Sequence, residues 1–280
     1  MSKKLRQEVE DIKLLGNIAR AYSEISALRM QQTREGVLKN REFSFGVEEL
    51  FQKTLFYYAN KHDVNRGQKL TFLSHNGRTV AAMFSANGGL YGKIVKDTFA
   101  MFADDIADKP DIEVVVVGKL GRSRFLESFP NRPYTFFELD DYKPPEEQMN
   151  EIMKHLVQYK KIHVYYGSFQ SIVNQTPKKF ALNRKVELPK EKSEEAVRYI
   201  FEPSLEDVLQ FFEGAVFGST FSQIVKESQL AKLGSRAFAM DQADQSISAD
   251  IRRKKLLMLK REHQTRNKKQ MNFLLSSVRR

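Results

Sequence analysis

Residues 5–28 read LRQEVEDIKLLGNIARAYSEISAL, and the spacing of their apolar side chains decides the architecture of the chain. These side chains recur every three or four residues, which places them on one face of an α-helix. They are Leu5, Val9, Ile12, Leu15, Ile18, Tyr22, Ile25 and Leu28. No proline occurs before Pro110, so nothing in this stretch forces a helix to end. The pattern predicts a helix from about residue 3 to about residue 60, broken or bent at most near Gly36 or Gly46.

The other end of the chain carries the same signal. Ser204 is a natural helix N-cap, Glu206 and Asp207 suit the positive end of the helix dipole, and no proline follows them. A helix over the remaining residues would be about 115 Å long at 1.5 Å per residue, which exceeds the width of a domain of this size. Its apolar stripe has to be covered by a partner or by the other terminal helix. The residues alone leave open which of the two covers it, and the terminal helices are predicted at residues 1–60 and 204–280.

Residues 68–190 have a different pattern, in which short β-branched and aromatic runs alternate with stretches of helical spacing. Strands are expected at residues 70–74, 80–85, 112–117, 134–139, 162–166 and 180–186, and helices at residues 90–106, 123–129 and 146–159. Such alternation indicates an α/β fold with a mostly parallel sheet. The chain is therefore predicted to contain a central α/β, Rossmann-like domain of about 130 residues that carries the two long helices.

The net charge of +11 is concentrated at one end of the chain. Residues 251–280 hold eleven Lys or Arg and one acid, Glu262, so this segment carries +10 and the rest of the chain carries +1. A basic helix neutralises phosphates, which leaves nucleic-acid binding as an alternative function. Phe273 is the single aromatic side chain of the segment that could stack on a base, which weighs against this alternative.

Composition and motifs exclude several kinds of catalytic site. The chain has no cysteine, which removes disulfides, thiol nucleophiles, iron–sulfur clusters and cysteine-type zinc sites. Its five histidines are dispersed, and no Gly-x-Ser-x-Gly motif occurs. The acid pairs Asp104-Asp105 and Asp140-Asp141 are interpreted as solvated caps or turns. No apolar stretch approaches the roughly 18 residues that cross a bilayer, so neither export nor membrane insertion is expected. We predict no catalytic residue, no metal and no cofactor.

One segment lies where a phosphate-binding loop would lie. Residues 85–93, SANGGLYGK, follow an apolar strand and open a predicted helix. Their glycines match neither the P-loop pattern nor Gly-x-Gly-x-x-Gly, and a tight strand-to-helix turn accounts for them. A nucleotide-dependent enzyme that uses this turn is a second alternative, and it predicts that the isolated chain binds ATP or NAD.

Motifs along nearly the whole chain resemble one family, the gamma subunit of F-type ATP synthases. Residues 17–30, NIARAYSEISALRM, are similar in register to its signature Lys-Ile-Thr-Lys-Ala-Met-x-Met-Val-Ala-x-x-Lys-Met. Residues 89–92, GLYG, resemble the end of its Ser-Asp-x-Gly-Leu-x-Gly segment, although the Asp is not where the family has it. Residues 162–169 resemble a later strand of the family, and residues 199–204, YIFEPS, resemble its Tyr-x-x-Glu-Pro-Ser.

The C-terminal match is the most specific of these resemblances. The family pattern there is Glu-Ser-x-Ala-Ser-Glu-x-x-Ala-Arg-Met-x-Ala-Met-x-x-Ala. The matching residues are Glu227, Ser228, Arg236, Ala239, Met240 and Ala243. The family's Ser-Glu is Ala231-Lys232 here, its first Met is Ala237, and its later Asn is Ser246.

The last thirty residues depart from the family. Its Arg-Gln pair aligns with Glu262-His263 or, after a shift of seven residues, with Lys269-Gln270, and its acidic end is replaced by Lys and Arg. Specific hydrogen bonds between rotor and beta subunit are therefore not carried over to this chain. The sequence resembles a divergent branch of the gamma subunits.

The resemblance implies a central-stalk rotor without catalytic activity of its own. In the family, the terminal helices, which correspond to residues 1–60 and 204–280 here, pair as a long antiparallel coiled coil inside a hexamer of alpha and beta subunits. The α/β domain of the family contacts the epsilon subunit and the membrane c-ring. Rotation of such a shaft would couple translocation of hydrogen or sodium ions to ATP synthesis or hydrolysis in the beta subunits. The implied location is the cytoplasmic face of a bacterial cell membrane, peripheral to it and within the ATP synthase complex.

The resemblance and the charge pattern together suggest which residues face the hexamer. The candidates are Ile18, Arg20, Ala21, Tyr22, Ile25, Arg29, Met30, Arg236, Ala239, Met240, Ala243, Arg252, Arg253, Lys254 and Lys255. Small and flexible side chains suit a shaft that has to turn, and the basic cluster 252–255 would be attracted to acidic loops. The alternative for that cluster is a solvated helix face.

Overall fold

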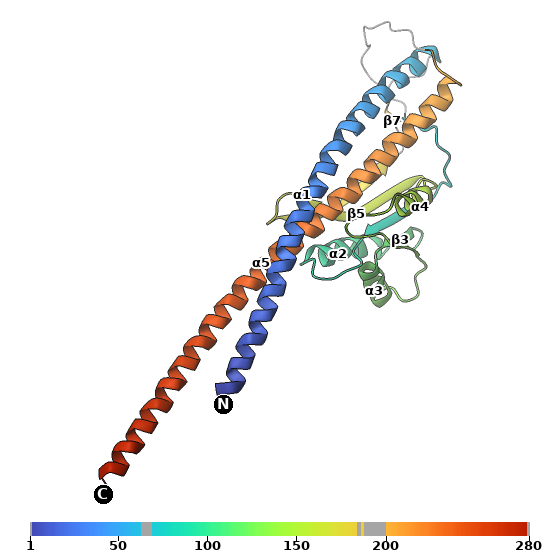
Figure 1. Ribbon diagram of the computed structural model, residues 1–280. Coiled ribbons are helices and arrows are strands. Elements are labelled where there is room, and N and C mark those ends of the chain that lie inside the picture. Colours follow the sequence, from blue (N-terminus) through green and yellow to red (C-terminus); the bar gives the residue numbers. More distant parts are fainter. Residues whose placement is uncertain (1, 63–68, 184–185, 188–199, 279–280) are drawn as a thin grey trace. The chain divides into compact units, whose positions relative to one another are not determined.

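The computed structural model describes residues 2–62, 69–183, 186–187 and 200–278, shown as the coloured ribbon in Figure 1. Two helices account for almost half of the chain: α1 spans Ser2–Lys61 and α5 spans Leu205–Val278. The predicted long helices are confirmed, and α1 runs without a break through Gly36 and Gly46. The chain divides into two compact units. The smaller unit holds residues 1–27 and 236–280, and the larger unit holds residues 28–235.

The larger unit is built on a five-stranded sheet with strand order β4-β3-β2-β5-β6. Its strands are β2 (Thr79–Phe84), β3 (Glu113–Val117), β4 (Thr135–Phe137), β5 (Lys161–Phe169) and β6 (Gln175–Asn183). The four strands from β4 to β5 are parallel, and β6 joins β5 antiparallel at the edge. The sheet is thus mostly parallel, as the alternation of strands and helices in the sequence predicted.

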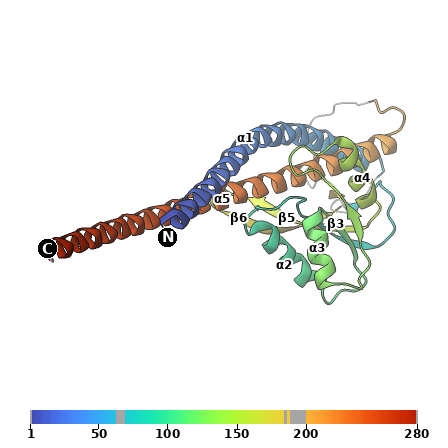
Figure 2. The ribbon, with the colours of Figure 1, turned by 60° about the horizontal axis from the view of Figure 1, so that its bottom comes forward.

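Helices cover both faces of this sheet, as Figures 1 and 2 show from two sides. Helices α2 (Ile94–Ile106) and α3 (Lys119–Ser128) pack on one face, where Phe102 and Phe125 meet Val116. Helix α4 (Glu146–Leu156) and the first half of α5 pack on the other face, where Ile152 and Phe221 lie in one core. Successive residues of a strand point to opposite faces, so each buried strand serves both cores.

Within the larger unit, the end of α1 and the start of α5 lie side by side and antiparallel. Phe51 and Leu55 of α1 are buried against Leu209 and Phe212 of α5. The predicted N-cap of α5 is confirmed, because the backbone N–H of Asp207 donates to the Ser204 hydroxyl at 3.1 Å.

The predicted strand at residues 70–74 is almost absent. Strand β1 is only Lys69–Leu70, paired antiparallel with β7 (Val186–Glu187). The reason lies in Glu213 of α5, whose carboxylate accepts hydrogen bonds from the backbone N–H groups of Phe72 at 2.6 Å and Leu73 at 3.1 Å. These donors are taken by a side chain, so they are not available to a neighbouring strand.

Several further element boundaries differ from expectation, among them the start of α3 at Lys119 instead of residue 123. The helix expected from residue 90 begins at Ile94, because Leu90 and Gly92 have φ of 67° and 57°, which is left-handed backbone that a helix does not contain. The strand expected at residues 180–186 begins earlier, at Gln175, and includes Pro177, which an edge strand tolerates. Residues 184–185, and residues 68 and 188–190 at the limits of the predicted α/β domain, lie outside the described residues.

Candidate functional site

The smaller unit is an antiparallel helix pair. Ion pairs join Glu8 to Lys254 at 2.8 Å and Arg20 to Asp244 at 3.1 Å, so partner numbers on α5 fall as those on α1 rise. A Cβ added at Gly16 would lie 3.0 Å from the Cγ2 atom of Ile247, which places the two helices close together there. These contacts confirm the predicted antiparallel pairing.

The face of α1 that meets α5 holds only the first part of the predicted apolar stripe. Val9 is buried there, Leu5 and Ile12 are half-buried, and the small residues Gly16, Ala19 and Ser26 are buried. The Ser23 hydroxyl donates to the carbonyl of Ala237 at 3.2 Å. Large apolar side chains of α1 remain exposed instead. They are Leu14, Leu15, Ile18, Tyr22, Ile25 and Leu28, a set that we call the open stripe. The exposed fractions of Ile18 and Ile25 are 46% and 45%. The other terminal helix therefore does not cover this stripe, and the requirement for a partner stands.

The remaining candidates of α1 are distributed between surface and internal contacts. Ala21 is exposed like the open stripe around it, whereas Met30 is half-buried. Arg20 pairs with Asp244. Arg29 belongs to the larger unit, where its guanidinium lies 3.6 Å from the ring centroid of Tyr142.

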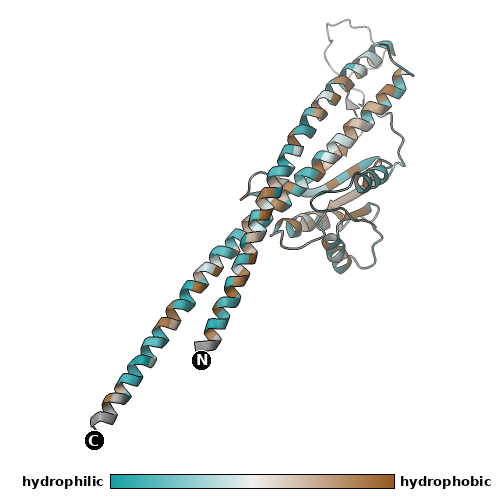
Figure 3. Ribbon diagram, in the orientation of Figure 1, coloured by the Kyte–Doolittle hydropathy of each residue, from teal (hydrophilic) through white to brown (hydrophobic). Residues whose placement is uncertain are grey.

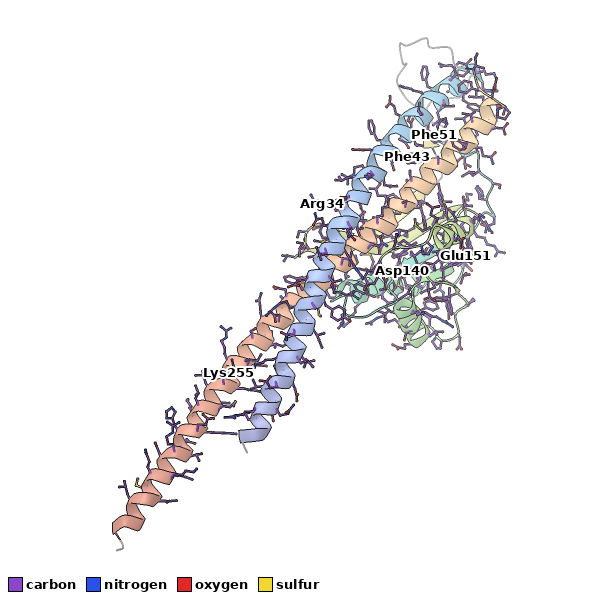
Figure 4. The ribbon with its side chains drawn as sticks, in the orientation of Figure 1. Arg34, Phe43, Phe51, Asp140, Glu151 and Lys255 are labelled. Carbon is purple, nitrogen blue, oxygen red and sulfur yellow. The ribbon has the colours of Figure 1, made fainter. Side chains whose placement is uncertain are left out.

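The candidates on α5 change in character along the helix. Arg236 is buried with its guanidinium over the ring of Tyr22, and Ala239, Met240 and Ala243 are half-buried. Farther along, Arg252, Arg253 and Lys255 are exposed, and Lys255 projects from α5 in Figure 4. Lys254 pairs with Glu8. The structure thus brings the basic cluster and exposed leucines together on one helical segment, since Leu256, Leu257 and Leu259 are also exposed.

Neither metal-binding nor membrane-spanning features occur in the described part of the chain. Among the described residues, no three His, Asp or Glu side chains group as metal ligands. None of the helices within the same residues is long and apolar enough to cross a membrane.

The turn at residues 85–92 is filled by a carboxylate of the protein itself. Asp141 Oδ2 accepts hydrogen bonds from the backbone N–H groups of Asn87 and Gly88, both at 2.9 Å. Its Oδ1 accepts from the ammonium of Lys232 at 2.8 Å, and the same ammonium donates to the carbonyl of Ser85 at 3.0 Å. A phosphate at this turn would have to displace Asp141, so the geometry argues against the nucleotide-site alternative.

Asp141 is a buried residue whose environment the sequence did not reveal. Its pairing with Asp140 suggested a solvated turn, and Asp140 does form one by accepting from the N–H groups of Tyr142 and Lys143. Asp141, in contrast, is only 5% exposed in its side chain, so that interpretation is wrong for this residue. Burial alone would raise its pKa, but the charge of Lys232 and the hydrogen bonds outweigh burial and lower it.

A second carboxylate cluster, around the half-buried Asp105, joins α2 to the sheet. Asp105 accepts from Lys109 at 2.6 Å, from Lys179 at 2.5 Å and from the hydroxyl of Tyr165. Burial would raise the pKa of Asp105, whereas these donors together lower it. The cluster is fully paired within the domain, and its role is structural.

Comparison with known proteins assigns this fold and sequence to one group. A family model described as ATP synthase matches residues 1–266. The ATP synthase gamma chain of Desulforamulus reducens is 22% identical over 98% of this chain and 96% of its own length. That of Roseiflexus sp. is 23% identical over 86% of this chain and 85% of its own length.

Two solved structures share the fold. The rotor of the Euglena gracilis mitochondrial ATP synthase has a TM-score of 0.61 at 13% identity, covering 94% of this chain and 98% of that chain. A chain of the central stalk and c-ring of the Tetrahymena thermophila mitochondrial enzyme has a TM-score of 0.57 at 17% identity, covering 81% and 99%.

Proposed function

The chain belongs to the ATP synthase family as a gamma-type, non-catalytic subunit of the rotor, and we propose which of its surfaces contact which partner subunits. The helix pair of the smaller unit turns inside a collar of alternating alpha and beta subunits. The α/β domain contacts the epsilon subunit and the membrane c-ring. The chain works on the cytoplasmic face of a bacterial cell membrane and is peripheral to it.

The open stripe is the observation that carries this proposal. A helix pair with large apolar side chains left exposed on one helix is an incomplete interface, because such patches in soluble proteins mark interaction surfaces. Figure 3 shows apolar segments along α1 and α5, interrupted by polar ones. A collar formed by other subunits covers the open stripe without deep interdigitation of side chains, and such a contact permits rotation.

The candidates of the smaller unit divide into three roles under this proposal. Ile18, Ala21, Tyr22 and Ile25 touch the collar directly. The basic residues Arg252, Arg253, Lys254 and Lys255 provide diffuse attraction to acidic loops of the hexamer. Arg20, Arg236, Ala239, Met240 and Ala243 hold the pair together, so that both helices present one surface.

Two likenesses support these partners. The similar Euglena and Tetrahymena chains come from structures described as a rotor and as a central stalk with c-ring. The nucleic-acid alternative has no such support, and the basic residues at issue lie on a helix that also exposes leucines, which is an arrangement suited to a protein collar.

The proposal is tested by co-expression of the chain with its own alpha and beta subunits. The double variant Ile18→Asp, Ile25→Asp places two charges on the open stripe without entering the core of the chain. We expect it to reduce recovery of the complex at least about tenfold, because two charges then have to be desolvated in the collar. The matched control is Ile172→Asp, Val173→Asp, two exposed apolar residues between β5 and β6.

The control should leave recovery unchanged. Equal recovery of the open-stripe variant and the wild type would show that the collar does not cover this stripe. A duplex-DNA complex of the wild-type chain at micromolar concentration, together with failure to recover alpha and beta subunits, would favour the nucleic-acid alternative.

A further inference from the structure

The loop between β4 and α4, residues 138–145, contacts both long helices. We call it the clamp loop. Hydrogen bonds within the loop and to α4 fix its shape. Asp140 accepts from the N–H groups of Tyr142 and Lys143, and Gln148 of α4 accepts from the N–H of Asp140 at 3.1 Å. The side-chain amide of Asn87 donates to the carbonyl of Leu139 at 2.8 Å and ties the loop to the turn after β2. Figure 4 labels Asp140 in this region of the larger unit.

The first contact of the clamp loop is the buried ion pair with α5. The side chains of Asp141 and Lys232 are 5% and 9% exposed, and four hydrogen bonds converge on the two charges. A buried pair of this kind adds little net stability, but breaking it leaves an uncompensated charge. Such a pair therefore fixes one arrangement of α5 against the domain more firmly than apolar packing of the same size, which tolerates sliding.

The second contact is with α1. The guanidinium of Arg29 lies over the ring of Tyr142, 3.6 Å from the ring centroid. Tyr142 directly follows Asp141 in the sequence. Two adjacent residues of one loop thus hold the two antiparallel helices by different interactions, an ion pair and a cation–π contact.

The place of these contacts along the helices is informative. The larger unit begins at Leu28 on α1 and ends at Ser235 on α5. Arg29 and Lys232 are therefore among the first and last residues by which each helix is attached to the unit that carries the sheet. Torque passing between the two units has to pass through this level of both helices.

We propose that Asp141, Lys232, Tyr142 and Arg29 form a two-point clamp that transmits torque between the α/β domain and the shaft, with Lys232 and Asp141 as its positioning residues. This inference rests on the rotor function proposed above. The clamp fixes the rotation of both helices about their axes where they leave the domain. It sets how stiffly a twist of the domain is passed to the shaft.

The experiment measures torsional stiffness in the assembled complex of alpha, beta and gamma subunits. Because the chain has no cysteine, a single Asp108→Cys substitution at an exposed site gives a unique attachment point on this subunit. A bead is attached there, the hexamer is fixed to a surface without nucleotide, and the angular fluctuation of the bead is recorded. The variants are compared in this background, with alpha and beta subunits that lack reactive cysteines.

Lys232→Met should increase the angular variance of the bead at least about twofold, because the buried ion pair is then lost and the Arg29–Tyr142 contact is what remains of the clamp. The matched control is Lys226→Met. Lys226 lies on the same helix, is partly buried, and donates to the carbonyl of Gly36 on α1, so it joins the two helices without touching the clamp loop. The control should leave the variance at the wild-type value.

A charge exchange, Asp141→Lys with Lys232→Asp, tests whether the clamp requires more than an ion pair, because a simple ion pair would tolerate the exchange. It should not restore stiffness, because the N–H groups of Asn87 and Gly88 would then face a cation. Lys232→Arg, which keeps the charge, should restore most of it.

A variance in Lys232→Met equal to that of the wild type would overturn the clamp. If this variant does not assemble, Tyr142→Ala decides, since that side chain is 38% exposed and its removal opens no core. Unchanged variance in Tyr142→Ala would then overturn the proposal, and increased variance would support it. A wild-type complex that hydrolyses ATP without turning the bead would overturn the rotor function itself, which keeps the two failures distinct.

Discussion

Glu213 illustrates, at the scale of single residues, how one buried charge organises backbone that has no strand partner. Its carboxylate accepts from the N–H groups of Phe72 and Leu73 and from the hydroxyl of Thr71 at 2.7 Å. The side chain is buried on α5, so these bonds join the loop after β1 to that helix. Local propensity favoured a strand at residues 70–74, and this distant side chain decided otherwise.

Glu213→Ala should lower the free energy of unfolding by about 2–4 kcal/mol, because three donors lose their acceptor in a buried site. The midpoint of urea denaturation of the purified chain measures the change. Glu151→Ala is the control, since Glu151 is exposed on α4 (Figure 4) and should shift the midpoint little. Equal midpoints for the two variants would show that the Glu213 contacts do not contribute to stability.

Two histidines give the larger unit a predictable dependence on pH. Burial, together with nearby Lys179, lowers the pKa of His163, and burial lowers the pKa of His155 despite the charge of Glu113. Below the unfolded pKa of about 6.5, the unfolded chain binds protons that the folded chain does not. Stability is therefore complete above this pKa and falls as the pH drops below it. The lowered pKa of Asp141 acts only below about pH 4, outside this window.

The free energy of unfolding should fall between pH 7.5 and pH 5.5 by no more than about 1.4 kcal/mol per pH unit for each histidine. Urea denaturation across this range measures the slope, and His163→Gln should reduce it. A slope that is unaffected by His163→Gln would exclude this residue as a source of the pH dependence.

At the scale of elements, the sequence predicted the existence of the long helices well and their contacts poorly. Helix extent depends on local features, namely apolar periodicity, the N-cap at Ser204 and the absence of proline. The side of α1 that meets α5 depends on how closely two backbones approach. Small residues such as Gly16 and Ala19 allow that approach, and the side chains of the open stripe remain exposed.

The clamp loop was beyond prediction for a related reason. Asp141 and Lys232 are 91 residues apart in the sequence, and no sequence motif indicates that the two side chains are in contact. The signal available in the sequence was a Lys at a position where the resembling family has Glu. The reason for that departure is visible only in the structure, where the ammonium of Lys232 contacts the buried carboxylate of Asp141.

Two glycines of α1 provide a test of the helix contacts. Gly46→Ala should stabilise the chain by about 0.5–1 kcal/mol, because a Cβ there meets open space and alanine favours helix. Gly16→Ala should not stabilise it, because the new Cβ would lie 3.0 Å from Ile247. Thermal unfolding followed by circular dichroism measures both. Equal stabilisation by the two substitutions would contradict the close helix contact at Gly16.

At the scale of the whole molecule, the distribution of charge is the feature that separates this chain from the family pattern. The segment 251–280 carries +10, and most of the described basic side chains of that segment are exposed. Under the proposed function, this charge would attract acidic loops of the collar. Its effect should therefore weaken with salt, because exposed charges are screened beyond about 10 Å at 0.1 M ionic strength.

Arg252→Ala, Arg253→Ala and Lys255→Ala together should lower ATP-driven ion pumping by the assembled complex about threefold at low salt, and less at high salt. Pumping into sealed vesicles measures the effect. Substitution of Arg34, Lys39 and Arg41, three exposed basic residues of α1 in the larger unit, is the control and should change little. Pumping that is unaffected at every salt concentration would mean that the basic cluster is only a solvated helix face.

The proposed function requires this chain to rotate within a hexamer, and ATP-driven rotation of a bead on the α/β domain is the measurement that decides it. The hexamer is fixed to a surface, and the bead is attached through Asp108→Cys. We expect continuous rotation in one direction when ATP is added and none without it. A complex that hydrolyses ATP while the bead stays at one angle would show that the chain is not a rotor.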